Sequence, residues 1–113
     1  MPRRVELLPG TLDLLILKAV SLGPQHGYGV LLRIEQMTKD ALSIEQGALY
    51  PALYRLERRG LLKAEWGVSD NQRKAKFYQL TPAGAHCLDE ETDGWKRLVS
   101  AMRLALNTRL EGA

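Results

Sequence analysis

The residues best suited to specific chemistry lie within residues 45–66, the stretch EQGALYPALYRLERRGLLKAEW. Gln46 carries an amide that can form two hydrogen bonds to one adenine, and Ala48 carries a methyl group that can touch a thymine methyl. Gly47, between them, has no side chain to hold the backbone away from a groove. These residue types in this order predict a surface that contacts the base edges of duplex DNA.

Two tyrosines extend this surface. Tyr50 and Tyr54 carry hydroxyls that reach phosphates as often as bases. For Tyr50, partial burial beside an apolar stripe is a nearly equal alternative.

A helix must position these groups. Leu49, Leu53 and Leu56, with Ala52 between them, recur at the spacing of a buried helical stripe. The opposite face then carries small, aromatic and cationic residues in turn, namely Gly47, Pro51, Tyr54 and Arg58, with Arg55 beside them. Gly60 stands where a helix ends in a left-handed residue.

Pro51 complicates this helix, because proline removes one hydrogen bond and crowds the carbonyl four residues earlier. Either the helix starts near Gln46 with Pro51 in a distorted second turn, or it begins only at Leu49 after a turn. Both possibilities remain open from the sequence.

A β-hairpin should follow this helix directly. Leu62, Ala64 and Trp66 alternate with charged residues, which indicates a half-buried strand. The turn formers of residues 69–72 precede a return strand over residues 73–80. One face of that strand is cationic near the tip and apolar at the base, as a hairpin that touches DNA requires. Its cations, with Arg58, are expected to hold phosphates: Arg73, Lys74 and Lys76.

The charge distribution agrees with a polyanionic partner. The chain of 113 residues has a net charge of +3, but residues 55–80 alone carry seven basic and three acidic side chains. Residues 1–54 are neutral overall and residues 81–113 have a net charge of −1. Positive charge that is concentrated on the helix and hairpin favours a site for nucleic acid over a generally cationic surface. The alternative without a function is that these charges are scattered over a solvated face.

Composition limits the remaining possibilities. The apolar and charged fractions, 45% and 26%, are ordinary for one soluble domain. No window approaches ~18 uninterrupted apolar residues, which argues against a membrane-spanning helix. The N-terminus lacks the apolar region of a secretion signal, and the lone Cys87 makes no internal disulfide, so a cytoplasmic protein is expected.

Two helices should precede the central one. The first, from Leu12 to about Leu22 with Thr11 as N-cap, is apolar on most of its circumference and should form the centre of the core or lie against a second subunit. The second opens at residues 26–29 and runs to about Lys39. Its His26 suits a turn or cap much better than a catalytic base. Residues 41–44 suggest a strand of one or two residues.

A long helix should end the chain. Thr81 and Pro82 have the form of an N-cap and first helical residue, and an apolar stripe then continues to about residue 110, with Gly94 as a position for a kink. This stripe is longer than an ~80-residue domain can cover, so a partner subunit is the simplest cover. The expected interface consists of Trp95, Leu98, Val99, Met102 and Leu106 of one chain against Leu12, Leu15 and Ile16 of the other.

The predicted fold is mainly α with a small β-hairpin: a winged helix-turn-helix at residues 1–80, followed by a C-terminal dimerisation helix at residues 81–113. The residues themselves resemble the PadR family of bacterial transcription factors. The matching segments are LLPGTLDLLILKAV, HGYGV, QGALYPALYRLERRGLL and AEWGVSDNQRKAKFYQLTPAG, with Trp95 beyond them. The short C-terminal region resembles the subfamily with a single dimerisation helix.

The resemblance implies a homodimer with two recognition helices in successive major grooves of a pseudo-palindromic operator and wings along the backbone. It also implies repression that is relieved by a small molecule or another signal. No cofactor is expected. Tyr28 joins the expected DNA contacts. Trp95 resembles in placement a tryptophan that contacts flat aromatic effectors in some members, whereas simple packing in the dimer interface is the favoured interpretation.

Two other classes of protein are alternatives to a DNA-binding regulator. An enzyme is disfavoured, because His86 and Cys87 are adjacent on a helix and their side chains diverge, and the acidic run of residues 89–93 suits a solvated helix face better than a metal site. A winged-helix module that binds only protein is the stronger rival. It predicts no dependence on Arg55, Arg58 or the wing lysines.

Overall fold

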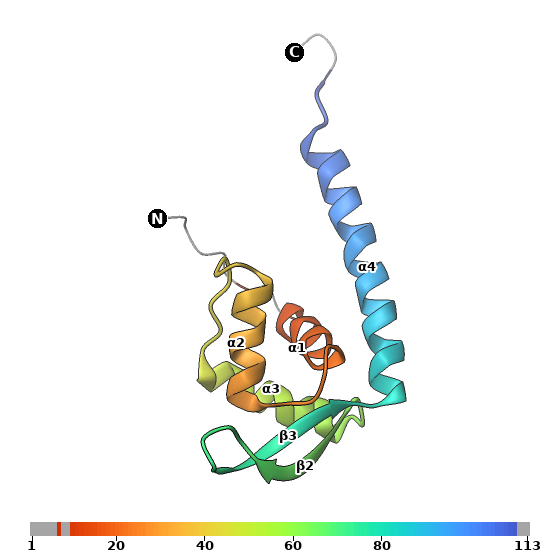
Figure 1. Ribbon diagram of the computed structural model, residues 1–113. Helices are drawn as coiled ribbons and strands as arrows, with labels where there is room; N and C mark the ends of the chain where they lie inside the picture. Colours follow the sequence, from red (N-terminus) through yellow and green to blue (C-terminus); the bar gives the residue numbers. More distant parts are fainter. Residues whose placement is uncertain (1–6, 8–9, 111–113) are drawn as a thin grey trace.

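The computed structural model describes residues 7 and 10–110. Its elements are α1 (Thr11–Ser21), β1 (Gln25–His26), α2 (Gly27–Met37), α3 (Gln46–Arg58), β2 (Leu62–Val68), β3 (Lys74–Leu80) and α4 (Pro82–Leu106). In Figure 1 the first three helices form a cluster, the β2–β3 hairpin lies beneath it, and α4 rises beside α1 from the end of β3. This order confirms the predicted winged helix-turn-helix with a long final helix.

Helix α1 is the centre of the core, as its sequence predicts. It contacts α2, α3, β3 and α4, and its inward residues Ile16, Leu17, Ala19 and Val20 are buried. The predicted cap is wrong by one residue: Gly10, in the left-handed region at φ 85°, is the N-cap, and Thr11 is the first helical residue. The helix therefore begins one residue earlier than the sequence suggests.

Helix α3 resolves the question raised by Pro51. The helix starts at Gln46, and Pro51 lies inside it. Proline offers no N–H to the carbonyl of Gly47, four residues earlier. Both residues lie on the exposed face, where water can serve that carbonyl. At the other end Arg59 is the C-cap and Gly60 adopts φ 76°, the left-handed residue that was predicted.

The sheet has three antiparallel strands in the order β1-β3-β2. The expected strand at residues 41–44 is wrong: this segment is irregular, and its Ile44 side chain is buried in the core. The third strand is formed instead by Gln25 and His26, which pair with Tyr78 and Phe77 of β3. Gln25 and His26 thus form a strand because they lie beside the edge of β3, although their own sequence does not predict one.

Helix α4 begins as predicted and runs on without a break. The Thr81 hydroxyl accepts a hydrogen bond from the N–H of Gly84 at 2.9 Å, Pro82 is the first helical residue, and the α-helix continues through Gly94. Its first turns pack on the core through Gly84, Cys87 and Leu88, so the helix follows the winged domain directly, without a linker between them.

The rest of α4 projects away from the core. The radius of gyration is 16.9 Å, whereas a compact chain of this length has about 13 Å. Leu98, Met102 and Leu106 are exposed along the projecting half. None of the described helices combines the length and the apolar character needed to cross a lipid bilayer.

Candidate nucleic-acid interface

The buried stripe of α3 fixes which of its faces meets solvent. Leu49, Ala52, Leu53 and Leu56 are completely buried. The opposite face, with the first turn, is therefore exposed, and it carries the residues predicted to read DNA: Gln46, Gly47, Ala48, Tyr50 and Tyr54. A Cβ built on Gly47 would meet no other atom within 4 Å, so this surface is open to a close approach.

The ring of Tyr50 lies against the start of α2. A Cβ on Gly27 would lie 2.5 Å from Cε1 of Tyr50, so any side chain at position 27 would require this ring to move. The neighbouring His26 is the N-cap of α2, and its Nδ1 accepts a hydrogen bond from the N–H of Gly29 at 3.1 Å. Packing thus explains Gly27, and His26 is a cap, as predicted.

Tyr54 and Arg58 form a pair on the exposed face of α3. Nη1 of Arg58 donates to the Tyr54 hydroxyl at 3.5 Å, and the guanidinium carbon lies 5.7 Å from the ring centroid. Because the hydroxyl oxygen accepts this bond, its own proton remains to be donated to a phosphate or base. Arg58 keeps further N–H groups for a phosphate.

Arg55 has a different environment from the one its sequence position suggests. Its Nη2 lies 3.0 Å from Oδ1 of Asp13 on α1. This ion pair joins α3 to the core helix, and DNA would have to compete with Asp13 for the guanidinium. Arg55 was predicted to bind DNA, and this contact with Asp13 is one that the sequence did not indicate.

The hairpin presents one mixed face toward α3. In the register of β2 and β3, Trp66 lies opposite Lys76, and Val68 lies opposite Lys74. Directly opposed residues share a face of the sheet. The ammonium of Lys74 lies 5.6 Å from the centroid of the Trp66 ring. Farther toward the root, Tyr78 is buried on this face, which confirms the predicted change from cationic tip to apolar base.

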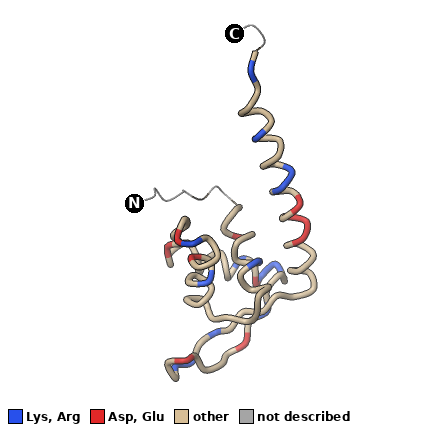
Figure 2. Tube along the Cα trace, turned by 45° about the horizontal axis from the view of Figure 1, so that its top comes forward, with Lys and Arg blue, Asp and Glu red and all other residues tan. Residues whose placement is uncertain are grey.

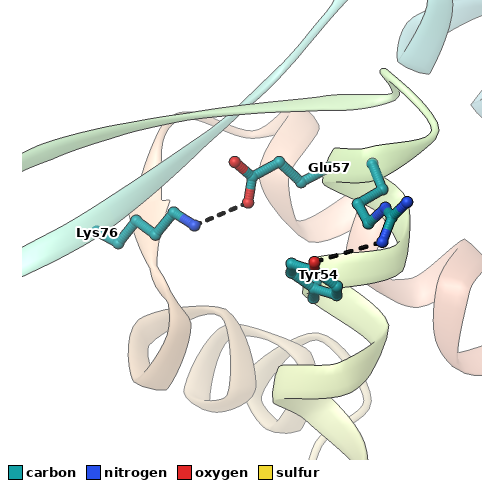
Figure 3. Close-up of polar contacts among 4 residues, drawn as sticks. Tyr54, Glu57 and Lys76 are labelled. Atoms are coloured by element: carbon teal, nitrogen blue, oxygen red, sulfur yellow. Dashed lines mark hydrogen bonds and ion pairs between the residues drawn. The ribbon is translucent and has the colours of Figure 1, made fainter.

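Lys76 is held from two sides. Its Nζ lies 2.9 Å from Oε1 of Glu57 on α3 (Figure 3). The same ammonium lies 5.8 Å from the centroid of the Tyr78 ring. The hydrogen bond to Glu57 is the main reason why the pKa of Lys76 is raised above its ordinary value. Burial is the main reason why the pKa of Tyr78 is raised. Lys76 thus stays protonated at neutral pH and is already paired.

A hollow of about 250 Å³ separates the hairpin from the starts of α2 and α3. Tyr28, Tyr50, Trp66 and Lys74 are among the residues that line it. Tyr28 and Tyr50 are exposed, as a DNA contact requires. Trp66 was not among the predicted site residues, because alternation placed it on the inward face of a half-buried strand. The hairpin extends beyond the core, and Trp66 is 66% exposed.

The predicted effector residue, Trp95, lies between two further hollows. One of about 260 Å³ separates α1 from α4 and includes Leu14 and Glu91, and the other, of about 540 Å³, follows the apolar stripe of α4. Of the predicted interface residues on α1, Leu12 and Leu15 are partly buried. Ile16 is completely buried within its own chain and is not available to a partner, which corrects that expectation.

Catalytic groups are not brought together. His86 pairs with Glu90 one turn later on the exposed side of α4. Cys87 is half-buried against the core. Within residues 7 and 10–110, no three side chains of His, Cys, Asp or Glu gather in a way that could hold a metal ion.

Comparison with known proteins adds a family. The model of the Transcriptional regulator PadR-like family matches residues 16–90. The transcriptional regulator Rv3488 of Mycobacterium tuberculosis is 39% identical over 57 residues, which cover 50% of this chain and 52% of that protein. The aligned segment therefore spans about half of each protein.

Solved structures agree over a greater length. A PadR family transcriptional regulator from Eggerthella lenta is 31% identical, with a TM-score of 0.75 over 88% of this chain and 85% of that one. A PadR-like transcription factor from Bacteroides fragilis is 28% identical, with a TM-score of 0.70 over 85% and 90% of the two chains.

Proposed function

The chain belongs to the PadR-like family of transcriptional regulators, and from this premise we propose that it acts as a homodimer that represses transcription at a pseudo-palindromic operator until a small molecule or another signal releases it. Members of this family are DNA-binding regulators and not enzymes. A regulator of a bacterial chromosome works in the cytoplasm, and we place this chain there as part of the proposal.

The observation that carries the DNA-binding part is the composition of one continuous surface. The exposed first turn of α3 offers Gln46, Gly47 and Ala48 to base edges. Arg58 at the other end of α3 and Lys74 on the hairpin are exposed beside it. A major groove accepts such a helix, while flanking cations on a helix and a wing hold phosphates of the backbone.

We assign separate roles along this surface. Gln46, Ala48 and Tyr54 are the proposed base contacts. Arg58, Arg73, Lys74, Tyr28 and Tyr50 are the proposed contacts to sugar and phosphate, and the exposed ring of Trp66 joins them at the wing.

The dimer is supported by the projecting half of α4. Trp95, Leu98 and Met102 are exposed along one stripe, with Val99 half-buried among them. An apolar stripe of this length is unfavourable in water and is covered most simply by a second copy of the chain. Residues 1–80 would then bind DNA, and residues 81–113 would join the two subunits.

The charges of α4 support the same arrangement. Acidic residues occupy the half near the core, at positions 89, 90, 91 and 93, and basic residues occupy the far half, at positions 96, 97 and 103 (Figure 2). Two copies of α4 that run antiparallel across a two-fold axis would place each acidic half near the basic half of its partner. Parallel copies would oppose like charges.

The hollows beside Trp95 are the proposed effector site. Pairing of two subunits would enclose the hollow along the stripe between apolar walls, as an aromatic ligand requires. A flat aromatic molecule would stack there on Trp95. Its binding should quench tryptophan fluorescence in wild type and less in Trp95→Phe, in which Trp66 is the remaining reporter.

Selection from a pool of random duplexes, followed by footprinting, tests the proposal. We expect an enriched motif with dyad symmetry and half-sites about 34 Å apart, one turn of DNA. A reporter gene under such a motif should be silenced when the chain is expressed. Absence of any enriched motif would favour a protein-docking module, and an enriched motif without dyad symmetry would contradict the two-fold dimer.

A further inference from the structure

The ion pair between Glu57 and Lys76 is the direct polar link between α3 and the wing (Figure 3). Its two atoms lie 2.9 Å apart, and the two side chains are only 29% and 35% exposed. The pair between Lys63 and Glu65 within β2 is longer, at 3.7 Å, and far more exposed. The Glu57–Lys76 pair is therefore short and partly shielded from water, as expected of an ion pair that fixes the position of the wing relative to α3.

The surroundings of Lys76 leave little freedom for its ammonium. Glu57 approaches from α3, and the buried Tyr78 ring lies 5.8 Å away within the sheet. A phosphate that took Lys76 would leave the Glu57 carboxylate unpaired beside the DNA backbone, where like charges repel. Lys74, by contrast, is exposed, and its described contact is the face of Trp66.

We propose that Lys76 is a positioning residue, which together with Glu57 sets the angle between the wing and α3, and that the phosphate affinity of the wing resides in Lys74 and Arg73. This inference rests on the proposed DNA-binding function. It also revises the expectation from sequence, which treated Lys74 and Lys76 as equivalent cations.

The salt dependence of DNA binding separates the two roles. Each phosphate contact contributes about 0.9 to the slope of log K against log salt concentration. The double variant Glu57→Gln/Lys76→Met keeps the net charge and the aliphatic stems, so we expect its slope to equal that of wild type. The matched variant Lys74→Met should lower the slope by about 0.9 per subunit, or about 1.8 for the homodimer.

A variant in which the two charged residues are exchanged tests whether the ion pair itself is what matters. In Glu57→Lys/Lys76→Glu the pair can form again with its polarity reversed. We expect the double neutral variant to lose up to about fivefold in operator affinity for each subunit, the value of one partly exposed ion pair. The exchanged variant should regain most of this loss. A phosphate contact at position 76 would not tolerate glutamate.

A third measurement needs no DNA. Hydrogen exchange of the amides in β2 and β3 should be faster in the double neutral variant than in wild type, and slow again in the exchanged variant. Circular dichroism establishes that each variant is folded. Faster exchange that the exchanged pair does not reverse would overturn the inference, as would a slope lowered by about 0.9 per subunit in the double neutral variant. If wild type binds no DNA, the proposed function fails, and hydrogen exchange alone decides the role of Lys76.

Discussion

Truncation of Leu98 to alanine tests whether the projecting half of α4 is a subunit interface. The side chain is 50% exposed in the single chain, so half of its surface remains for a partner to cover. Complete burial of a leucine is worth about 1.5–3 kcal/mol. The uncovered half therefore contributes about 1 kcal/mol per subunit, and a two-fold axis counts it twice.

Alanine keeps part of this contact, so Leu98→Ala should cost the dimer about 1–2 kcal/mol. That corresponds to a dissociation constant raised by roughly 5- to 30-fold. Leu104 is the matched control, because it lies on the same helix, is 75% exposed and does not line the hollow along the stripe. We expect Leu104→Ala to dissociate at the wild-type concentration.

Sedimentation over a range of concentrations measures both variants. Wild type should have a mass of about 25 kDa, twice the 12.7 kDa of one chain, and Leu98→Ala should begin to dissociate at higher concentrations than Leu104→Ala. A wild type that stays monomeric at micromolar concentrations would refute the reasoning. Equal dissociation of the two variants would place the interface elsewhere.

Three further predictions follow from the structure. Gln46→Ala should cost about 1–3 kcal/mol at particular operator positions in a library of single-base variants, and an equal loss at every position would assign specificity to DNA shape. Gly84→Ala should lower the free energy of unfolding by about 1–3 kcal/mol in a denaturant titration, because the new Cβ would overlap the backbone carbonyl oxygen of Leu61, and an unchanged value would show that the start of α4 can shift freely. The pKa of Lys76 is raised first by the hydrogen bond from its ammonium to Glu57, and the pKa of Tyr78 is raised first by burial, so the folded chain holds both protons more tightly than the unfolded chain. The contribution of these groups to the free energy of unfolding should be complete below about pH 10 and disappear at higher pH. This loss of stability at high pH should be smaller in Glu57→Gln/Lys76→Met than in wild type.

The local part of the site could be predicted from sequence because its signals are local. The leucine spacing of α3 determines which side is buried, and therefore which side carries Gln46 and Tyr54. The caps at Gly60 and Thr81 depend on only a few neighbouring residues. The fold class follows from the order of these elements.

The missed features depend on residues far apart in the chain. Arg55 is 42 residues from Asp13, and Lys76 is 19 residues from Glu57. No periodicity encodes such distances, so all the cations of residues 55–80 looked equally free. Trp66 was misplaced for a related reason, because alternation distinguishes the two faces of a strand but not the point at which the strand leaves the core.

Because Lys76 is paired with Glu57, the long-range attraction of DNA and the direct binding of phosphate depend on different sets of cations. Long-range attraction of DNA depends on the net charge, which is +4 for residues 55–80 whether or not Lys76 is paired with Glu57. The number of displaced counterions depends instead on the cations that touch phosphate. A variant that neutralises both Glu57 and Lys76 should therefore keep the rate of encounter and the salt slope, whereas loss of Lys74 should lower both. Comparison of association rates and salt slopes for these variants distinguishes cations that attract DNA from cations that hold it.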